Sequence, residues 1–327
     1  MVTIGIIGTG FGAKIHLPGF RSLKNAKVLA IVGNDFSKSL SISREAKLPL
    51  IFKSWKELAA CPEIKAVSIA TPPYLHAEMA TFVMKMGKHV LCEKPLAVSV
   101  SEAEKMVAFA KHYKVVNMID FEFRNIPHWI RTRNILQNGE IGNVRYINIS
   151  WITGGKAKKG IPPNWKNFAK DGGGVLLEFG SHIADYVEWF FGPITAVLAD
   201  LKTVKQQTGG VRGTGFAEDT INVLMRLKNG ATVNASASNV MHGGRGHWIE
   251  IYGSKGTLKL INPNLEDSIY GFDLWEEKLG MNGLKKVTIP GDLSKKESGY
   301  KDGRLLVFIE IAKKFIGAIQ GNKKIDC

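Results

Sequence analysis

Short apolar runs alternate with longer amphipathic stretches over the first 120 residues. The runs are rich in β-branched residues and occupy positions 2–7, 27–32, 66–70, 89–93 and 114–118. Between them, apolar residues recur at helical spacing, and Ser99 and Ser101, each three residues before a glutamate, predict the start of one helix. Alternation of this kind predicts a parallel sheet with helices on both faces. The last run ends at Met118, so we place a first domain at 1–120 and a second at 121–327.

The second domain has a different pattern, in which strand-like segments follow one another closely. The segments are 144–151, 195–201, 219–227, 231–238, 248–252 and 257–261. Asn229-Gly230 predicts one hairpin turn, and the stretch from Gly253 to Gly256 predicts another. The chain as a whole is therefore predicted to be α/β, with a parallel sheet followed by a second, strand-rich α/β domain.

Composition agrees with two folded domains and excludes several classes of protein. The chain has 327 residues, of which 45% are hydrophobic and 22% charged, enough to bury a sizeable core in each domain. The formal charge of +15 is divided between the domains: 16 basic against 9 acidic residues in 1–120 give +7, and 28 against 20 in 121–327 give +8. A spread charge does not favour nucleic-acid binding.

The N-terminus and the cysteines bear on location and metal binding. Met1 leads directly into an apolar strand without a basic signal region, and no apolar stretch approaches the length of a membrane span. We expect a cytoplasmic protein that does not bind membranes. Three cysteines, Cys61, Cys92 and Cys327, have neither paired nor metal-ligand spacing, so we expect reduced thiols and no metal site.

A glycine-rich turn directly follows the first strand. The sequence GTGFGA places Gly8, Thr9, Gly10, Phe11 and Gly12 between strand and helix. Such a turn lets backbone N–H groups and a helix N-terminus approach a pyrophosphate, so it predicts dinucleotide binding.

The tip of the second strand bears on which dinucleotide binds. An acid at that tip binds the adenine ribose and favours NAD, but here the strand ends at Gly33-Asn34. Lys38 is close enough along the chain to meet a 2′-phosphate, so we predict NADP. The alternative is that Asp35, from a slightly longer loop, takes the ribose role and the cofactor is NAD.

Further motifs give the chain a family resemblance. Residues 67–97 contain ATPP followed by a histidine, GKHV and EKP, and later stretches include PNWKNF (163–168), GGGVLLEFGSHIAD (172–185), AEDTINVLMRLKNGATV (217–233) and IEIYGSKGTLKL (249–260). Together these resemble the Gfo/Idh/MocA family of NAD(P)-dependent oxidoreductases. The resemblance implies a Rossmann domain followed by a domain with a large, mostly antiparallel open sheet. It also implies a homo-oligomer, a dimer or tetramer, formed through that sheet.

The resemblance assigns roles in the first domain to residues of the ATPP and EKP motifs. It implies that Lys94 lies beside the nicotinamide and the substrate hydroxyl, that Glu93 helps to hold it, and that the Lys94-Pro95 bond is cis. Positions near the cofactor are implied for Thr71, Pro72, His16 and His76.

In the second domain, the stretch EFGSHIAD contains three polar residues at helical spacing. Glu178, His182 and Asp185 are spaced i, i+4, i+7 and can share one helix face, although this spacing by itself favours a solvated polar face. The resemblance implies that His182 is the general acid/base and that Glu178, at the position of the family's preceding acid, is a further catalytic residue. Glu178 stands where the family usually has aspartate, and if the helix begins at Gly180 it lies in the approach loop.

Other residues of the second domain are candidates for binding substrate. Trp165 and Lys166 match a W-[RK] pair of the family, while Arg124, Trp151 and Asp185 are further candidates. The run 156–170 contains five lysines and no acid before Asp171, which raises the expectation of an anionic sugar derivative.

The expected activity is hydride transfer between nicotinamide C4 and a secondary alcohol or ketone of a sugar, polyol or sugar derivative. Two alternatives within the family are a dinucleotide-sensing protein without turnover and an NAD-dependent glycosidase. The helix-like stretch 302–320 is followed by few residues, where the family usually adds another segment. The sequence therefore leaves open whether the C-terminus docks on the Rossmann domain.

Overall fold

The computed structural model describes residues 1–157, 164–204, 215–264, 267–289 and 300–321. The chain forms two compact units. The first contains Met1–Glu122 and the chain from Arg304 onward, and the second contains Phe123–Gly303. The predicted second domain, 121–327, therefore extends too far, because its C-terminal helix belongs to the first unit.

The first unit is built on a parallel sheet in the order β2-β1-β3-β4-β5. Its strands are β1 (Val2–Ile7), β2 (Ala26–Val32), β3 (Ala66–Ile69), β4 (His89–Glu93) and β5 (Asn117–Asp120). The first four agree closely with the predicted runs, whereas β5 begins three residues later than predicted. The helix before β5 continues to Tyr113 and ends on Lys114, which has a left-handed backbone with φ 51°, so the predicted start of that strand forms the helix end.

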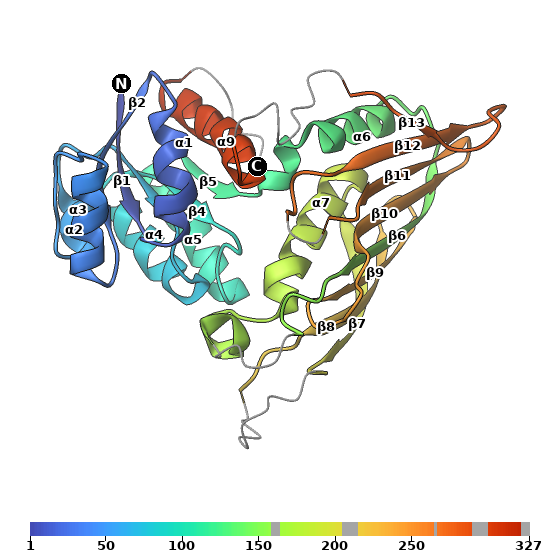
Figure 1. Cartoon of the computed structure of the whole chain (residues 1–327), viewed down its shortest axis with the longest axis horizontal. Coiled ribbons are helices and arrows are strands. Elements are labelled where there is room, and N and C mark those ends of the chain that lie inside the picture. The colour runs from blue at the N-terminus through green and yellow to red at the C-terminus, as the bar shows by residue number, and fades with distance from the viewer. Residues whose placement is uncertain (158–163, 205–214, 265–266, 290–299, 322–327) are drawn as a thin grey trace. The chain divides into compact units, whose positions relative to one another are not determined.

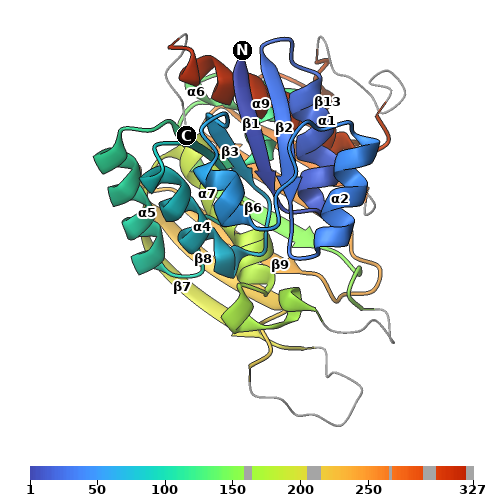
Figure 2. The ribbon, with the colours of Figure 1, turned by 90° about the vertical axis from the view of Figure 1, so that its left-hand side faces the viewer.

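Helices cover both faces of this sheet because alternate strand residues point to opposite faces. The helices are α1 (Leu17–Arg21), α2 (Phe36–Glu45), α3 (Trp55–Ala60), α4 (His76–Lys85), α5 (Val100–Tyr113) and α9 (Gly303–Ile319). Ile7 packs in a core with Leu58 and Val83 of α3 and α4, whereas its neighbour Ile6 approaches Gly12 on the opposite face. Figure 2 shows α4 and α5 side by side. Of the two capping serines, Ser99 caps α5 by accepting a hydrogen bond from Glu102 N.

The C-terminal helix α9 packs on α1 of the first unit. Phe308 is 1% exposed and forms an edge-to-face pair with Phe20 at 5.4 Å between ring centroids. A Cβ on Gly19 would come within 2.4 Å of the Phe308 ring, so this glycine allows the close approach of the two helices. The docking that the sequence left open is thus present.

The second unit contains a sheet of eight strands in the order β13-β12-β11-β10-β6-β9-β8-β7 (Figure 1). The strands are β6 (Val144–Ile152), β7 (Ile194–Lys202), β8 (Thr220–Leu227), β9 (Thr232–Ser238), β10 (Gly246–Gly253), β11 (Gly256–Asn262), β12 (Asp273–Lys278) and β13 (Lys285–Lys286). All neighbours are antiparallel except β6 and β9, which are parallel. The predicted fold class is confirmed.

Two helices, α6 (Pro127–Gln137) and α7 (Ser181–Phe191), lie on one face of this sheet (Figure 1). The sequence missed β12 and β13. The segment DLWEEK of β12 places only Leu274 in the core and is otherwise half-buried, and charged residues have low strand propensity, so no alternation is visible. In the part of the chain that the structure describes, no helix is both long enough and apolar enough to cross a membrane.

Candidate active site

The glycine turn lies at the carboxyl end of β1, where doubly wound sheets bind ligands. Gly8 has φ 121°, and its N–H donates to Val32 O on β2. A Cβ on Gly8 would lie 2.2 Å from the carbonyl oxygen of Ala70, the residue that follows β3. Only glycine fits there, so the sequence pattern reflects a real steric requirement.

The other two glycines of the turn differ in what surrounds them. A Cβ on Gly12 would come within 2.9 Å of Ile6, so Gly12 lets the following helical turn (Gly12–His16) approach the sheet. A Cβ on Gly10 would meet no atom within 4 Å. Gly10 therefore leaves open space at the carboxyl edge, and the turn fits a dinucleotide pyrophosphate approaching its backbone.

The tip of β2 carries the residues predicted to choose between NAD and NADP. Asn34, Asp35 and Lys38 are all exposed. Asp35 is the N-cap of α2, and its Oδ1 accepts a hydrogen bond of 3.0 Å from Lys38 N. One oxygen of the only acid at this tip is thus used to cap the helix.

His76 links the loops that follow β3 and β4. Its Nδ1 lies 2.8 Å from Pro95 O and its Nε2 lies 2.9 Å from Thr71 O. The neutral ring donates to one of these carbonyls, and the protonated ring donates to both. Burial lowers the pKa of His76, although the two carbonyl groups oppose this. His76 therefore holds the ATPP loop against the EKP loop, in which the Lys94-Pro95 bond is cis.

Beside this loop, three buried polar side chains meet at the ends of the strands. His16 Nε2 lies 2.9 Å from Glu93 Oε1 and 3.8 Å from Asp120 Oδ2, and its Nδ1 lies 2.7 Å from Ser68 Oγ. Glu93 and Asp120 are the last residues of β4 and β5 and are opposite each other in the sheet. The ring of His16 also contacts Phe11 of the glycine turn, with 5.4 Å between centroids.

The acids around Lys94 have strongly different proton affinities. Burial, and then the charges of Glu93 and Glu122, raise the pKa of Asp120 well above its usual value. Burial also raises the pKa of Glu122 to about 7, although Lys94 opposes this. For Glu93, burial is outweighed by the hydrogen bond from His16 and the charges of His16 and Lys94, so its pKa is lowered. Such divergence among neighbouring acids is typical of functional sites.

In the second unit, the stretch EFGSHIAD is helical throughout. Residues Leu176–Gly180 form a π-helical turn that runs into α7, so Glu178 does not lie in an approach loop. The apolar residues of α7 face the core as their spacing predicts, and Ile183, Tyr186 and Val187 are 0–1% exposed. The three polar residues of the motif each have a different environment.

His182 lies among aromatic rings rather than on a solvated face. It is 3% exposed, stacks on Phe123 at 4.5 Å between centroids, and lies 5.9 Å from the Trp151 ring. The stacking fixes the orientation of the imidazole. The interpretation of this motif as an exposed polar face is therefore wrong for its central residue.

Trp151 is held between two parallel rings. Phe179 stacks on it at 4.1 Å and His247 at 4.3 Å, with interplanar angles of 6° and 4°. Trp151 and His247 are opposite each other on β6 and β10, and such cross-strand pairs are close enough to stack. His247 Nε2 contacts the Tyr186 hydroxyl at 3.1 Å, and burial lowers the pKa of His247 to about 3. This histidine is therefore neutral at physiological pH.

Arg124 and Asp185, both predicted to bind substrate, bind each other. Arg124 Nε donates to Asp185 Oδ2 at 3.0 Å and Nη2 donates to Oδ1 at 2.5 Å. This bidentate pair joins the segment before α6 to α7 and helps to fix the helix that carries His182. The guanidinium also lies 5.8 Å from the Trp189 ring.

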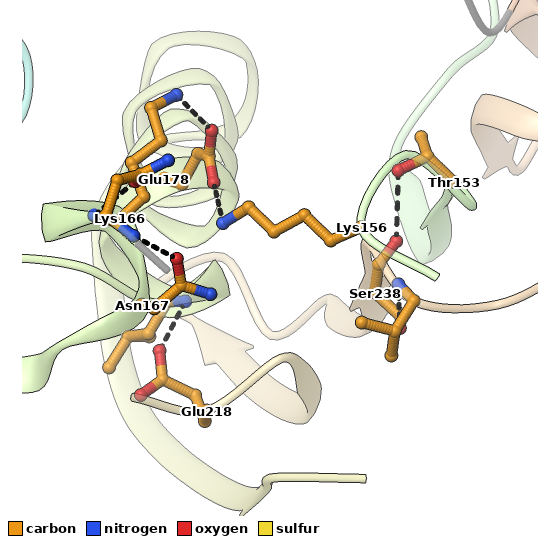
Figure 3. A network of polar contacts seen from close by, with 10 residues as sticks. Thr153, Lys156, Lys166, Asn167, Glu178, Glu218 and Ser238 are labelled. Atoms are coloured by element: carbon orange, nitrogen blue, oxygen red, sulfur yellow. Dashed lines mark hydrogen bonds and ion pairs between the residues drawn. The ribbon is translucent and has the colours of Figure 1, made fainter. Parts of the chain in front are cut away.

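Glu178 binds two lysines of the basic run (Figure 3). Its Oε2 accepts from Lys156 Nζ at 3.1 Å and its Oε1 accepts from Lys166 Nζ at 2.7 Å. Lys166 also lies 5.6 Å from the ring of its neighbour Trp165, which is half-buried. The three charges leave a net +1, so part of the positive charge of the run is already balanced. Residues 158–163 of that run lie outside the described residues.

The sequence interpretation missed several residues that the structure brings to these sites. Asp120 is the last residue of a parallel strand, and Glu122 follows that strand closely. Doubly wound sheets bind ligands at this end of their strands, so the position of both residues was the available signal. Phe123, Phe179 and His247 had no such signal, because only packing brings them to His182 and Trp151.

Comparison with known proteins agrees with this arrangement. Residues 2–121 match the model of an oxidoreductase family with an NAD-binding Rossmann fold, and residues 129–259 match the GFO/IDH/MocA C-terminal domain. An uncharacterized oxidoreductase of Synechocystis sp. is 33% identical over 323 residues, which cover 97% of this chain and 86% of that protein. Levoglucosan dehydrogenase of Pseudarthrobacter phenanthrenivorans is 28% identical over 285 residues, covering 79% and 73%.

Among solved structures, a levoglucosan dehydrogenase in complex with NADH and levoglucosan has the same fold. The TM-score is 0.86 at 23% identity, and the match covers 99% of this chain and 91% of that one. Both halves of the chain thus match models of one family, and a relative matches nearly its full length, in agreement with the observed glycine turn and the two sheets. The chain belongs to the GFO/IDH/MocA family of NAD-binding oxidoreductases.

Proposed function

We propose that this oxidoreductase transfers hydride between nicotinamide C4 and a secondary alcohol or ketone of a sugar or polyol. The observation that carries the proposal is that this chain, a member of the family, has both a lysine directly after β4 and a histidine on α7. Each of the two residues lies in a fixed environment. Lys94 directly precedes Pro95, whose carbonyl oxygen contacts His76, and His182 is stacked on Phe123. The levoglucosan dehydrogenase relative supports a sugar-like substrate.

The chain's own residues have separate tasks in this proposal. The turn at Gly8, Gly10 and Gly12 binds the pyrophosphate. The dinucleotide supplies or accepts the hydride when it is bound. His182 accepts the hydroxyl proton during oxidation and returns it during reduction, for which an imidazole is suited near neutral pH. Lys94 stabilises negative charge that develops on the substrate oxygen.

Glu178 and the aromatic residues complete the second-unit site in the proposal. Trp165, which is half-buried, offers apolar surface to a sugar ring. Trp151 is stacked between Phe179 and His247, so it contributes to the site by packing. Glu178 positions Lys156 and Lys166, and Asp185 and Arg124 fix α7. Because Glu178 already balances part of the basic run, we propose a neutral sugar or polyol and treat an anionic derivative as the alternative to test.

For the dinucleotide, we propose NADP. In support, Asn34 and Lys38 are exposed at the tip of β2, and Asp35 is partly used as a helix cap. NAD is the alternative, and the relative solved with NADH favours it. Comparison of the dissociation constants of NADPH and NADH decides between them, and equal or tighter NADH binding contradicts the NADP proposal.

We also propose a cytoplasmic homo-oligomer formed through the open sheet. The edge strand β7 is exposed along nearly its whole length, with Val197 61% and Leu198 72% exposed, which an isolated subunit would leave in water. Cys61 and Cys92 are unpaired thiols, as expected in a reducing compartment. Light scattering on wild type and Leu198→Lys tests the oligomer, and a wild-type monomer contradicts it.

The activity itself is tested by a thermal-shift panel followed by turnover assays. We expect oxidised and reduced dinucleotides to stabilise the protein, and a neutral sugar or polyol to reduce the oxidised form. Sugar phosphates and uronates form the second arm. Dinucleotide binding without turnover of any polyol, sugar or ketose would instead support a sensor.

A further inference from the structure

A pair of largely buried acids, Glu93 and Asp120, lies at the carboxyl edge of the parallel sheet, and Asp120 has no part in the function proposed above. Glu93 and Asp120 end adjacent strands, and one carboxylate oxygen of each and a ring nitrogen of His16 all lie within 4.8 Å of one another. The side chain of Asp120 is 3% exposed and that of Glu93 is 13% exposed. Two carboxylates this close and this buried repel each other strongly, so together they favour holding one proton.

The hydrogen bonds indicate which acid holds that proton. Glu93 Oε1 has His16 Nε2 at 2.9 Å as a donor, which favours its ionised form. Asp120 Oδ2 is farther from this nitrogen, at 3.8 Å, and its Oδ1 is buried without a hydrogen-bond partner among the residues that the structure describes. An ionised Asp120 would have little compensation for burial, so the proton belongs on Asp120.

The surrounding charges have opposing effects on the proton affinity of this pair. Glu122 adds a second negative neighbour and Lys94 a positive one, and the net effect, after burial, is a raised pKa of Asp120. Among the described residues, further titratable or charged groups that interact with the pair or its neighbours include His16, His76, Cys92 and Arg304. An additional positive charge near Asp120 would shift the balance toward its ionised form.

We propose that Asp120 holds a proton in the free protein and in the complex with reduced dinucleotide, and releases it when the oxidised dinucleotide, whose nicotinamide ring is cationic, binds. The inference rests on the proposed function, which places the nicotinamide beside Lys94. In the release step the Asp120 O–H bond breaks, its electron pair stays on the carboxylate, and the proton passes to the buffer. Asp120 is thus a positioning residue that adjusts the charge around Lys94 to the redox state of the cofactor.

Calorimetric titration tests this without turnover. The full chain, dialysed against a chelator, is titrated at neutral pH with the oxidised and then the reduced dinucleotide, in buffers of different ionisation enthalpy. The dependence of the observed heat on that enthalpy gives the number of protons released. We expect about half to one proton for the oxidised form and close to none for the reduced form.

Two variants locate the proton. Asp120→Asn is expected to abolish the release while still binding the reduced dinucleotide, and Glu122→Gln, the matched neighbour, is expected to keep most of it. Equal release for both redox forms in the wild type would overturn the inference while leaving dinucleotide binding intact. Release that is lost in Glu122→Gln but kept in Asp120→Asn would also overturn it. Absence of binding by either form overturns the proposed function together with the inference.

If Asp120→Asn does not fold, infrared spectroscopy of wild type labelled at its aspartates gives the same answer. The protonated-carboxyl band of a buried aspartate should be present in the free protein and should disappear on addition of the oxidised dinucleotide. A band that persists in that complex overturns the inference.

Discussion

In the first unit, His16 stacks on Phe308 at 4.1 Å between ring centroids, but it also contacts Ser68 and Glu93 and lies beside buried acids. In the second unit, His182 and His247 stack on aromatic rings that carry no charge. The surroundings of Lys94 are rich in charge, and the pKa of Asp120 and that of Glu122 are raised there. Around His182 the nearest rings carry no charge, and burial keeps His247 neutral.

The difference indicates two ways of preparing a side chain for chemistry. At the edge of the parallel sheet, neighbouring charges adjust proton affinity, and small changes in charge should alter binding. On the antiparallel sheet, packing fixes orientation, and changes in shape should matter more than changes in charge. The predictions below test this contrast.

The largest effect is expected for His182→Ala. Loss of the proposed acid/base should lower turnover by about 10²- to 10⁴-fold, while the dinucleotide dissociation constant stays nearly unchanged because the glycine turn is in the first unit. Steady-state kinetics and fluorescence titration measure the two quantities. His112→Ala, an exposed histidine, is the control. Retained turnover in His182→Ala removes this residue from proton transfer.

Gly10→Ala should weaken dinucleotide binding by about tenfold or more without affecting the fold. A Cβ at Gly10 meets no protein atom within 4 Å, so the cost arises only when a pyrophosphate approaches. Gly155→Ala, in the second unit, has equally open space and should change neither property. Gly8→Ala should destabilise the protein itself because of its φ and the contact with Ala70. Unchanged affinity in Gly10→Ala would argue against the pyrophosphate position.

Stability should respond to acid in opposite ways in the two regions. His247 has a pKa of about 3 in the folded state and an ordinary value of 6.5, so between these the unfolded state binds a proton that the folded state does not. Its contribution therefore lowers stability as pH falls from 6.5, by up to about tenfold in the unfolding equilibrium constant per pH unit. His247→Phe, which preserves a ring against Trp151, should flatten that decline in urea denaturation.

The contribution of Glu122 to stability changes with pH in the opposite direction. Its folded-state pKa of about 7 is above its ordinary 4.5, so the folded state gains a proton first and stability from this group rises as pH falls from 7 to 4.5. Glu122→Gln should remove that gain. If the free energy of unfolding of wild type, His247→Phe and Glu122→Gln changed with pH in the same way, the contrast between the two regions would be contradicted.

The smallest effect is expected for Glu178→Gln, because its partners Lys156 and Lys166 remain in place. If Glu178 only positions these lysines, we expect a loss of a few fold, about 0.5–1 kcal/mol, mainly in KM for the sugar. Glu104→Gln, an exposed acid of α5, is the control. A loss in kcat as large as that of His182→Ala would instead place Glu178 in the proton transfer.

Much of the first unit could be predicted because its signals are local. A strand, a glycine turn and a helix cap at Ser99 depend on residues within a few positions of one another. The same holds for most strands of the second unit, with alternating burial as in β8. The prediction failed where pattern and environment diverge, as in the charged strand β12.

The candidate site was predicted only in part for the same reason. Sequence and resemblance alone indicated the residues of the glycine turn, Lys94 and His182 as those to examine. Only the tertiary structure decided what surrounds them: the pairing of Glu93 with Asp120, the two lysines on Glu178, and the place of α9 in the first unit. These contacts join residues far apart in the chain, and burial sets their proton affinities. The spacing of residues along the sequence predicts neither these long-range contacts nor these proton affinities.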